Sequence, residues 1–179
     1  MRRAILVLVT GALLASCAST INTEPVNTGP LGDGGTPGEE CVPVDAKSPS
    51  AVIGIDALQN TSNETVTIDS VILAYPKQLK LTSVLLVPIA QHNLIGVALT
   101  YPPPQGPEPG VMWDQRRPAP GTTIAPGSLT ENLVAMVTAE ATTAQAAGLI
   151  VSYHNTGHRY ILHTATRIRL QVSPSVCAP

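Results

Sequence analysis

Two of the four histidines lie close enough in the sequence to share a metal ion. His154 and His158 flank the segment Asn155-Thr156-Gly157, and a glycine in third place favours a three-residue hairpin loop. In such a hairpin the two histidines are cross-strand neighbours with Cβ atoms ~5 Å apart, so a two-histidine metal site is geometrically possible. His163 would lie ~16 Å along the strand on the opposite face, and no carboxylate neighbours the turn. We therefore expect exposed turn residues and no cofactor, with a metal at His154 and His158 as the alternative.

Residues suited to covalent or acid-base catalysis do not form a recognisable constellation. The sequence contains no G-x-S-x-G motif, and Gly127-Ser128 lacks the strand-to-helix context that activates a serine. The carboxylates are scattered, so no spacing singles out an acid pair. Those of the expected domain are Asp56, Glu64, Asp69, Glu108, Asp114, Glu131 and Glu140. The glycines form no phosphate-binding loop, so we expect a protein that is not an enzyme, with a hydrolase as an alternative.

A long proline-rich segment, residues 102–127, carries the only tryptophan. Trp113 lies in it together with Arg116 and Arg117. A loop of this length in a compact domain is usually functional or mobile, and polyproline stiffness lowers the entropy that is lost on docking. The segment is therefore our first candidate for a binding surface. The alternative is a lid in which Trp113 folds over one end of the domain with an arginine stacked on its ring.

Tyr153, Arg159 and Tyr160 form a second candidate binding group beside the expected hairpin. Tyrosines suit binding surfaces because one side chain offers both an apolar ring and a polar hydroxyl. The alternative is that both rings pack in the core and at a sheet edge, with their hydroxyls at the surface. The sequence alone leaves both interpretations open.

The first residues have the layout of a secretory signal peptide. Met1-Arg2-Arg3 is a short cationic start, and residues 4–15 are apolar except for Thr10 and Gly11. A dozen helical residues rise only about 18 Å, well short of the ~30 Å hydrocarbon core of a bilayer, so a spanning helix is the poorer interpretation. We therefore expect residues 1–16 to be a cleaved signal peptide.

The end of this segment, Leu14-Ala15-Ser16-Cys17, resembles the lipobox of bacterial lipoproteins. The resemblance implies that Cys17 is linked through a thioether to a diacylglycerol. The partner that it implies is a membrane, reached through this lipid, and the place is the cell membrane or outer envelope with the domain outside the cytoplasm. Two or three acyl chains hold a protein on a membrane almost permanently, whereas one does not. The alternative is an ordinary signal peptide with a coincidental cysteine.

The resemblance also suggests how the three cysteines are used. With Cys17 assigned to lipid, Cys41 and Cys177 are left as a natural pair for an oxidising compartment. Their disulfide would close a loop of about 135 residues, worth roughly 5 kcal/mol in the chain-entropy model. It would tie the last strand to the segment that leads into the domain. Two free thiols or an intermolecular bond are the alternatives.

Composition restricts both the partners and the fold. The formal net charge of −2 becomes −4 without Arg2 and Arg3, and no Lys/Arg cluster is present, so nucleic acid is an unsuitable partner. Phe is absent, and the core must be built from Val, Ile, Leu and Ala. The residues of highest β propensity alternate in several segments, which favours strands.

Residues 17–47 are rich in Ser, Thr, Asn, Gly and Pro without hydrophobic periodicity, which predicts a flexible tether. A folded domain is expected over residues 48–179. Ser50–Leu58 and Thr65–Ala74 alternate and predict a hairpin, and the apolar run 84–87 is expected to end at Pro88. Further strands are expected at residues 94–101, 128–139, 148–154, 159–166 and 167–172, and a helical turn or loop at 140–147.

Seven to nine strands without a long helix predict an all-β protein, an antiparallel β-sandwich with immunoglobulin-like topology. In strand number and size it resembles immunoglobulin-like modules of exported bacterial proteins, although the antibody-type signature of a buried tryptophan between two core cysteines is not expected here. We expect a lipid-anchored, non-enzymatic protein whose domain mediates interaction with another envelope protein or polymer. The alternative is a small-ligand or metal-binding accessory module of the cell envelope.

Overall fold

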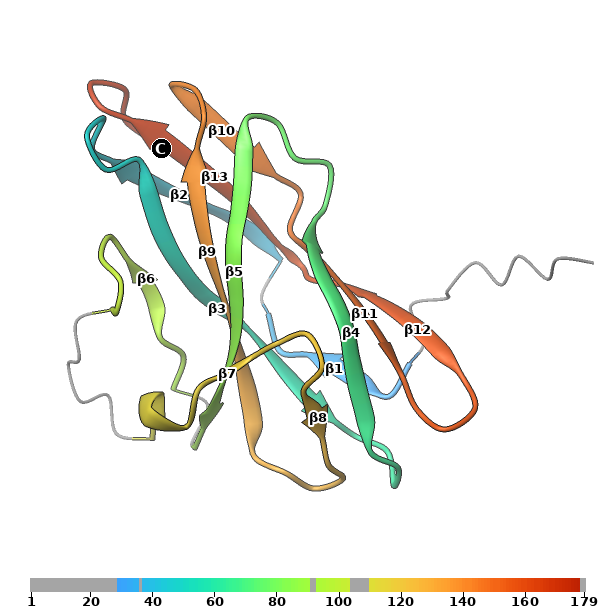
Figure 1. The fold of residues 1–179 in the computed structure, drawn as a ribbon. Coiled ribbons are helices and arrows are strands. Elements are labelled where there is room, and N and C mark those ends of the chain that lie inside the picture. The colour runs from blue at the N-terminus through green and yellow to red at the C-terminus, as the bar shows by residue number, and fades with distance from the viewer. Residues whose placement is uncertain (1–28, 36, 91–92, 104–109, 178–179) are drawn as a thin grey trace, which may run out of the picture.

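The computed structural model of the 179-residue chain describes residues 29–35, 37–90, 93–103 and 110–177. These residues form thirteen strands and one short 3-10 helix (Figure 1). The predicted signal peptide, Cys17 and the first part of the predicted tether lie outside the described residues.

The first sheet contains the longest strands and has the order β1-β3-β9-β5-β7. The sixth strand, β6, pairs with β3 on the edge that faces away from β9. β1 pairs with the same edge, at the other end of β3. The strands are β1 (Leu31–Asp33), β3 (Ser50–Asn60), β5 (Leu79–Ile89), β6 (Gly96–Ala98), β7 (Arg117–Pro118) and β9 (Thr130–Ala139).

Two smaller sheets, β12-β11-β4-β8 and β10-β13-β2, make up the second layer. Their strands are β2 (Gly38–Val44), β4 (Val66–Leu73), β8 (Thr123–Ile124), β10 (Thr143–Ala146), β11 (Leu149–His154), β12 (Arg159–His163) and β13 (Thr166–Val172). The breaks between β10 and β11 and between β12 and β13 lie side by side, because Leu149 N donates to Thr164 Oγ1 at 3.0 Å and Thr164 N donates to Leu149 O at 2.9 Å. The two sheets are therefore one layer with a bend (Figure 1).

The main core fills the space between the layers. Side chains of both layers alternate between buried and exposed positions, as in β11, where every second residue from Leu149 to Tyr153 is buried. Leu86, Leu133 and Leu170 are almost fully buried between the layers. The all-β sandwich predicted from the sequence is confirmed.

The connectivity is that of a constant-type immunoglobulin sandwich. When the strands are lettered A to G in chain order, those of the first sheet lie side by side as A, B, E and D (β1, β3, β9, β5). The second layer contains C (β4), F (β10 with β11) and G (β12 with β13). Nine strands have four or more residues among those described, in agreement with the expected seven to nine. One pair departs from the antiparallel pattern, because β2 lies parallel to β13 over seven residues.

The folded part begins earlier than predicted. β1 and β2 both lie within residues 17–47, where the sequence predicted a flexible tether. Leu31, Val42 and Val44 are nevertheless buried in the main core. The prediction failed because these few apolar residues are spaced among glycines, prolines and acidic residues, so no hydrophobic period is visible.

The predicted hairpin between residues 50–58 and 65–74 is wrong. β3 pairs with β1, β6 and β9, and β4 pairs with β8 and β11, so the two strands lie in opposite layers. The connection is held by Asn60, whose side chain donates to Glu64 O at 2.7 Å and to Ile124 O at 2.9 Å. Alternation identified each strand but carried no information about its partner.

Three further boundaries differ from the predictions. β5 continues through Pro88, whose carbonyl accepts from Met112 N at 3.0 Å and so faces away from β9. The missing N–H of Pro88 points to the same side, and no bond to β9 is lost. Residues 140–147 contain the strand β10 rather than a helical turn or a loop, and the strand expected at 94–101 is only three residues long.

Candidate functional site

The part of the proline-rich segment around Trp113 covers the outer face of the first sheet instead of projecting from it. Trp113 begins the 3-10 helix η1 (Trp113–Gln115) and is only 8% exposed. Its ring belongs to a small second core with Val52, Val87 and Val134 of the sheet below. The structure thus places Trp113 as a lid residue, which was the alternative interpretation of the sequence.

The lid is held by contacts on both sides of the tryptophan. The Arg116 guanidinium lies 5.2 Å from the Trp113 ring centroid, and the Tyr101 ring approaches edge-on with centroids 6.0 Å apart. Arg117 Nη2 lies 2.6 Å from Glu131 Oε1, and the Glu131 side chain is almost fully buried. Arg117 therefore fastens the lid to β9, and Arg116 is the more exposed of the two arginines.

The tyrosines of the second candidate group belong largely to the core. Tyr153 is 1% exposed, stacks on Tyr160 with centroids 5.2 Å apart, and accepts a hydrogen bond from Leu31 N at 3.3 Å. Burial raises the pKa of the Tyr153 hydroxyl, and the bond from Leu31 opposes that rise in part. Tyr160 is half-buried, and Arg159 is the one residue of this group that is fully exposed.

The β11–β12 hairpin differs from the predicted three-residue loop. His154 is the cross-strand partner of Arg159, and His158 lies within the loop, where Asn155 N donates to His158 O at 3.1 Å. His154 Nδ1 lies 2.7 Å from Asp69 Oδ1, and Asn155 Nδ2 donates to Glu64 Oε2 at 2.7 Å. The expectation that no carboxylate neighbours the turn is therefore wrong, because Asp69 of β4 and Glu64, just before β4, reach it from about 90 residues away.

The two histidines do not face one another as a metal site would require. Within the described ranges, no group of three or more His, Cys, Asp or Glu side chains is placed to hold a metal ion. The predicted disulfide between Cys41 and Cys177 is confirmed, with Cα atoms 5.9 Å apart. It joins β2 to the segment after β13 and so reinforces the parallel pair.

A surface that sequence reasoning missed is the outer face of β4, β11 and β12. Ile72, Ile150 and His163 lie in one row across these strands, and Ser70, Ser152 and Ile161 lie in the next. Ile72 is 54% exposed, and neither hydrophobic cluster of the described residues includes any of the three isoleucines. The sequence predicted Ile72 on the same face as Ile68, but a bulge near Ser70 turns Ile72 outward.

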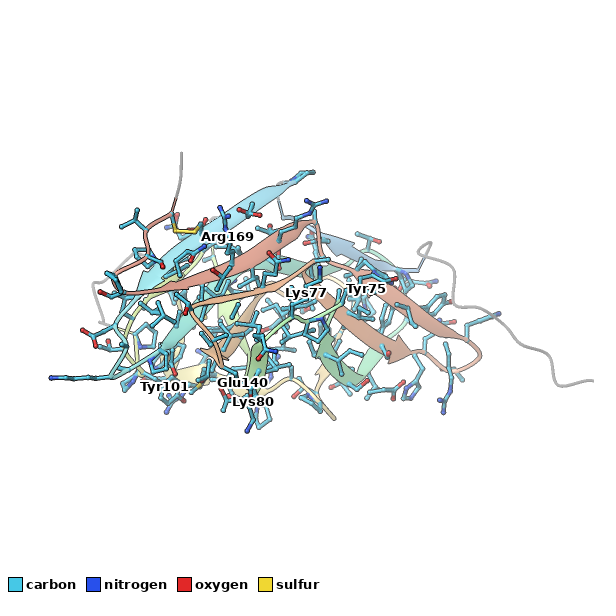
Figure 2. The ribbon with its side chains drawn as sticks, turned by 90° about the horizontal axis from the view of Figure 1, so that it is seen from above. Tyr75, Lys77, Lys80, Tyr101, Glu140 and Arg169 are labelled. Atoms are coloured by element: carbon cyan, nitrogen blue, oxygen red, sulfur yellow. A yellow bond between two sulfur atoms is a disulfide. The ribbon has the colours of Figure 1, made fainter. Side chains whose placement is uncertain are left out.

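The outer face of the first sheet keeps one shallow groove beside the lid. It has a volume of about 170 Å³, and its lining includes Leu99, Tyr101 and Met136. Ser50 and Thr138 also line it, but their hydroxyls bond to each other at 2.8 Å. Tyr101 lies on the same side of the molecule as Lys80 and Glu140, opposite Arg169 (Figure 2).

The chain stands apart in comparisons with known proteins: no protein-family model, curated protein or solved structure matches it. In the part of the chain that the structure describes, no helix has the length and apolar character needed to cross a membrane.

Proposed function

We propose that this chain is a lipid-anchored extracytoplasmic protein that binds another envelope protein through the outer face of β4, β11 and β12. The observation that carries the proposal is a cluster of three isoleucines over two neighbouring rows of that face: Ile72 is exposed, and Ile150 and Ile161 are partly exposed. Contiguous exposed apolar side chains rimmed by polar residues mark protein contact surfaces, whereas single ones do not. No catalytic step belongs to the proposed function.

The polar groups around the isoleucines support recognition by shape and apolar contact. Asp69 is paired with His154, and Glu64 accepts from Asn155, so both acids of this face have partners within the domain. Arg159 is exposed at the rim, where a partner's acidic group can reach it. Rim charges of this kind steer association more than they add affinity.

The way in which the chain enters the domain is compatible with this surface. Gly29 packs against Tyr153 and Tyr160, and Pro30 O accepts from Thr61 N at 2.9 Å, so the N-terminal segment arrives beside the β11–β12 hairpin. Cys17 precedes Gly29 by 12 residues, which span at most about 40 Å when extended. The proposed anchor thus keeps the isoleucine face within a short distance of the membrane.

Cross-linking in intact cells, followed by mass spectrometry, tests the proposal. The variant Ile72→Asp places a charge at the most exposed isoleucine of the face and should abolish enrichment of the partner. Leu129→Asp is the matched control, because Leu129 is similarly exposed but lies outside this face. Equal enrichment with wild type, Ile72→Asp and Leu129→Asp would rule out the surface, and capture of a glycan would identify a polymer as the partner.

A small-ligand accessory function has one observation in its favour, the groove beside Tyr101. Its apolar floor and exposed aromatic ring suit a small amphipathic molecule. A thermal-shift screen of wild type against Tyr101→Ala tests this version: a ligand that raises the wild-type Tm alone supports it. A zinc titration tests the metal version, and no change in Tm at micromolar zinc would exclude it.

A further inference from the structure

A buried carboxyl group lies where the second layer bends. Asp56 of β3 is 2% exposed and points between the two layers, opposite the buried Leu133 of β9. Thr166 Oγ1 donates to Asp56 Oδ1 at 3.1 Å, and Thr164 also bonds to this carboxyl. Both threonines belong to the junction between β12 and β13, so Asp56 contacts the bend directly.

A second carboxylate reaches the same place from β1. Asp33 Oδ2 accepts from Ala165 N at 2.9 Å, and its Oδ1 accepts from Gly35 N at 2.8 Å. A Cβ atom on Gly35 would lie 2.5 Å from Asp56 Oδ1 and 3.0 Å from Asp33 Oδ1. The two oxygens therefore lie no more than about 5.5 Å apart around Gly35, and a side chain at that position has no room.

This environment penalises the charged form of Asp56. Burial is the largest cause and the neighbouring Asp33 charge the second, and together they raise the pKa of Asp56 to about 6 although the Thr164 and Thr166 hydroxyls oppose the rise. Around the pair, Glu131 of β9 is neutralised by Arg117, Arg169 of β13 pairs with Glu39, and His163 and Arg167 are exposed. Among the described residues, no lysine or arginine forms an ion pair with Asp33 or Asp56.

We propose that Asp33 and Asp56 form a proton-dependent latch, which holds β1 on the bend of the second layer in acid and releases it when both carboxyls are ionised. One proton on the pair removes the repulsion between the two carboxylates. Without it, the buried Asp56 carries a negative charge next to the carboxylate of the partly exposed Asp33. Detaching β1 separates the charges and lets both groups be solvated.

The remaining attachments of β1 are few, which makes it the releasable element. It pairs with β3 over three residues and buries one large side chain, Leu31. β2, the next strand, pairs with β13 over seven residues and is joined to the domain by Cys41–Cys177. Release therefore stops at β2, and residues 29–37 become available as about 30 Å of extended chain, which lengthens the tether if the proposed anchor is correct.

The direction of the pH effect follows from proton linkage. The latched state binds the Asp56 proton more tightly than the open state, where Asp33 no longer lies beside it and the pKa moves back toward its ordinary value of 3.8. The stabilisation of the latch is thus complete below that value and is lost as the pH rises through about 6. Between pH 5 and pH 8 the opening constant should rise by at most about tenfold, the limit set by a full return of the Asp56 pKa to 3.8.

Hydrogen exchange on the full chain, purified from membranes in detergent, measures this opening. The reporting amides are Gly34, Thr61 and Ala165, which bond to Ala57 O, Pro30 O and Asp33 Oδ2. After correction for intrinsic exchange rates, their opening should be more frequent at pH 8 than at pH 5, by up to about tenfold. Amides between β2 and β13 are the internal reference and should not change.

Two variants make the result specific. Asp56→Asn keeps the shape and the acceptor for Thr166 but cannot ionise, so the pH dependence should vanish. Asp69→Asn removes an exposed carboxylate and should retain it. Equal opening of wild type at both pH values, or a rise with pH that persists in Asp56→Asn, would overturn the latch.

A direct titration keeps the proposal testable even where Asp56→Asn does not fold. Carbon-13 NMR of the wild-type aspartate carboxyls should give an Asp56 midpoint near pH 6, and a lower midpoint in Asp33→Asn. A wild-type midpoint near 4 would refute the proton-dependent mechanism.

Discussion

The two layers of this sandwich present outer faces that are both apolar in part, and the chain covers only one of them. On the first sheet, Val52, Val87 and Val134 point outward and are buried under Trp113. On the second layer, Ile72, Ile150 and Ile161 point outward and remain accessible. The connection between β5 and β9 thus does for one face what we propose that a partner does for the other.

The difference separates two uses of apolar outward-facing residues. Under the lid they contribute to the stability of the domain, since the lid and the sheet fold together and form a second core. On the open face we propose that a partner buries them, so that they contribute affinity instead. Mutations on the covered face should therefore lower stability, and mutations on the open face should weaken partner binding.

The largest expected effect is on the covered face. Trp113→Ala removes a buried aromatic ring from the second core and should lower the free energy of unfolding by about 3 to 5 kcal/mol. Urea denaturation followed by circular dichroism measures this loss. A loss below about 1 kcal/mol would mean that the lid is not part of the folded core.

An intermediate effect is expected where the lid is fastened. Arg117→Ala leaves the buried Glu131 carboxylate without its partner and should cost about 1 to 3 kcal/mol, toward the lower end because Arg117 itself is partly exposed. The double variant Arg117→Ala, Glu131→Gln removes the unpaired charge and should recover part of the loss. If it recovers nothing, the charge of Glu131 is not the cause.

The smallest effect on stability is expected on the open face. Ile72→Ser should change the free energy of unfolding by no more than about 0.5 kcal/mol, as is usual for exposed sites away from special features. The same variant should weaken partner capture in the cross-linking experiment. A stability loss similar to that of Trp113→Ala would show that the open face is also a structural core.

The sequence predicted the fold class well because strand alternation and turn residues are local signals. It could not predict which strands pair, and so placed β3 and β4 in one hairpin when they lie in opposite layers. It missed β1 and β2 because Leu31, Val42 and Val44 are isolated among polar and glycine residues.

The candidate site was harder to predict because its features depend on distant contacts. The bulge near Ser70 decides that Ile72 faces outward, and a single residue of shift is enough to reverse it. Asp33 and Asp56 meet only because β1 lies beside β3 and both reach the bend near Ala165. Of the predicted binding residues, Trp113 and Tyr153 are buried, as in the alternative interpretation given for each of them.

The Cys41–Cys177 bond also decides how the domain carries mechanical load. A pull on the N-terminal segment can strip β1 and the first residues of β2, but at Cys41 it meets a covalent closure. All strands from β3 to β13 lie inside the loop that this bond closes, 136 residues apart in sequence. Tension applied between the N-terminal segment and the residues after Cys177 therefore passes from Cys41 to Cys177 without being transmitted through those strands.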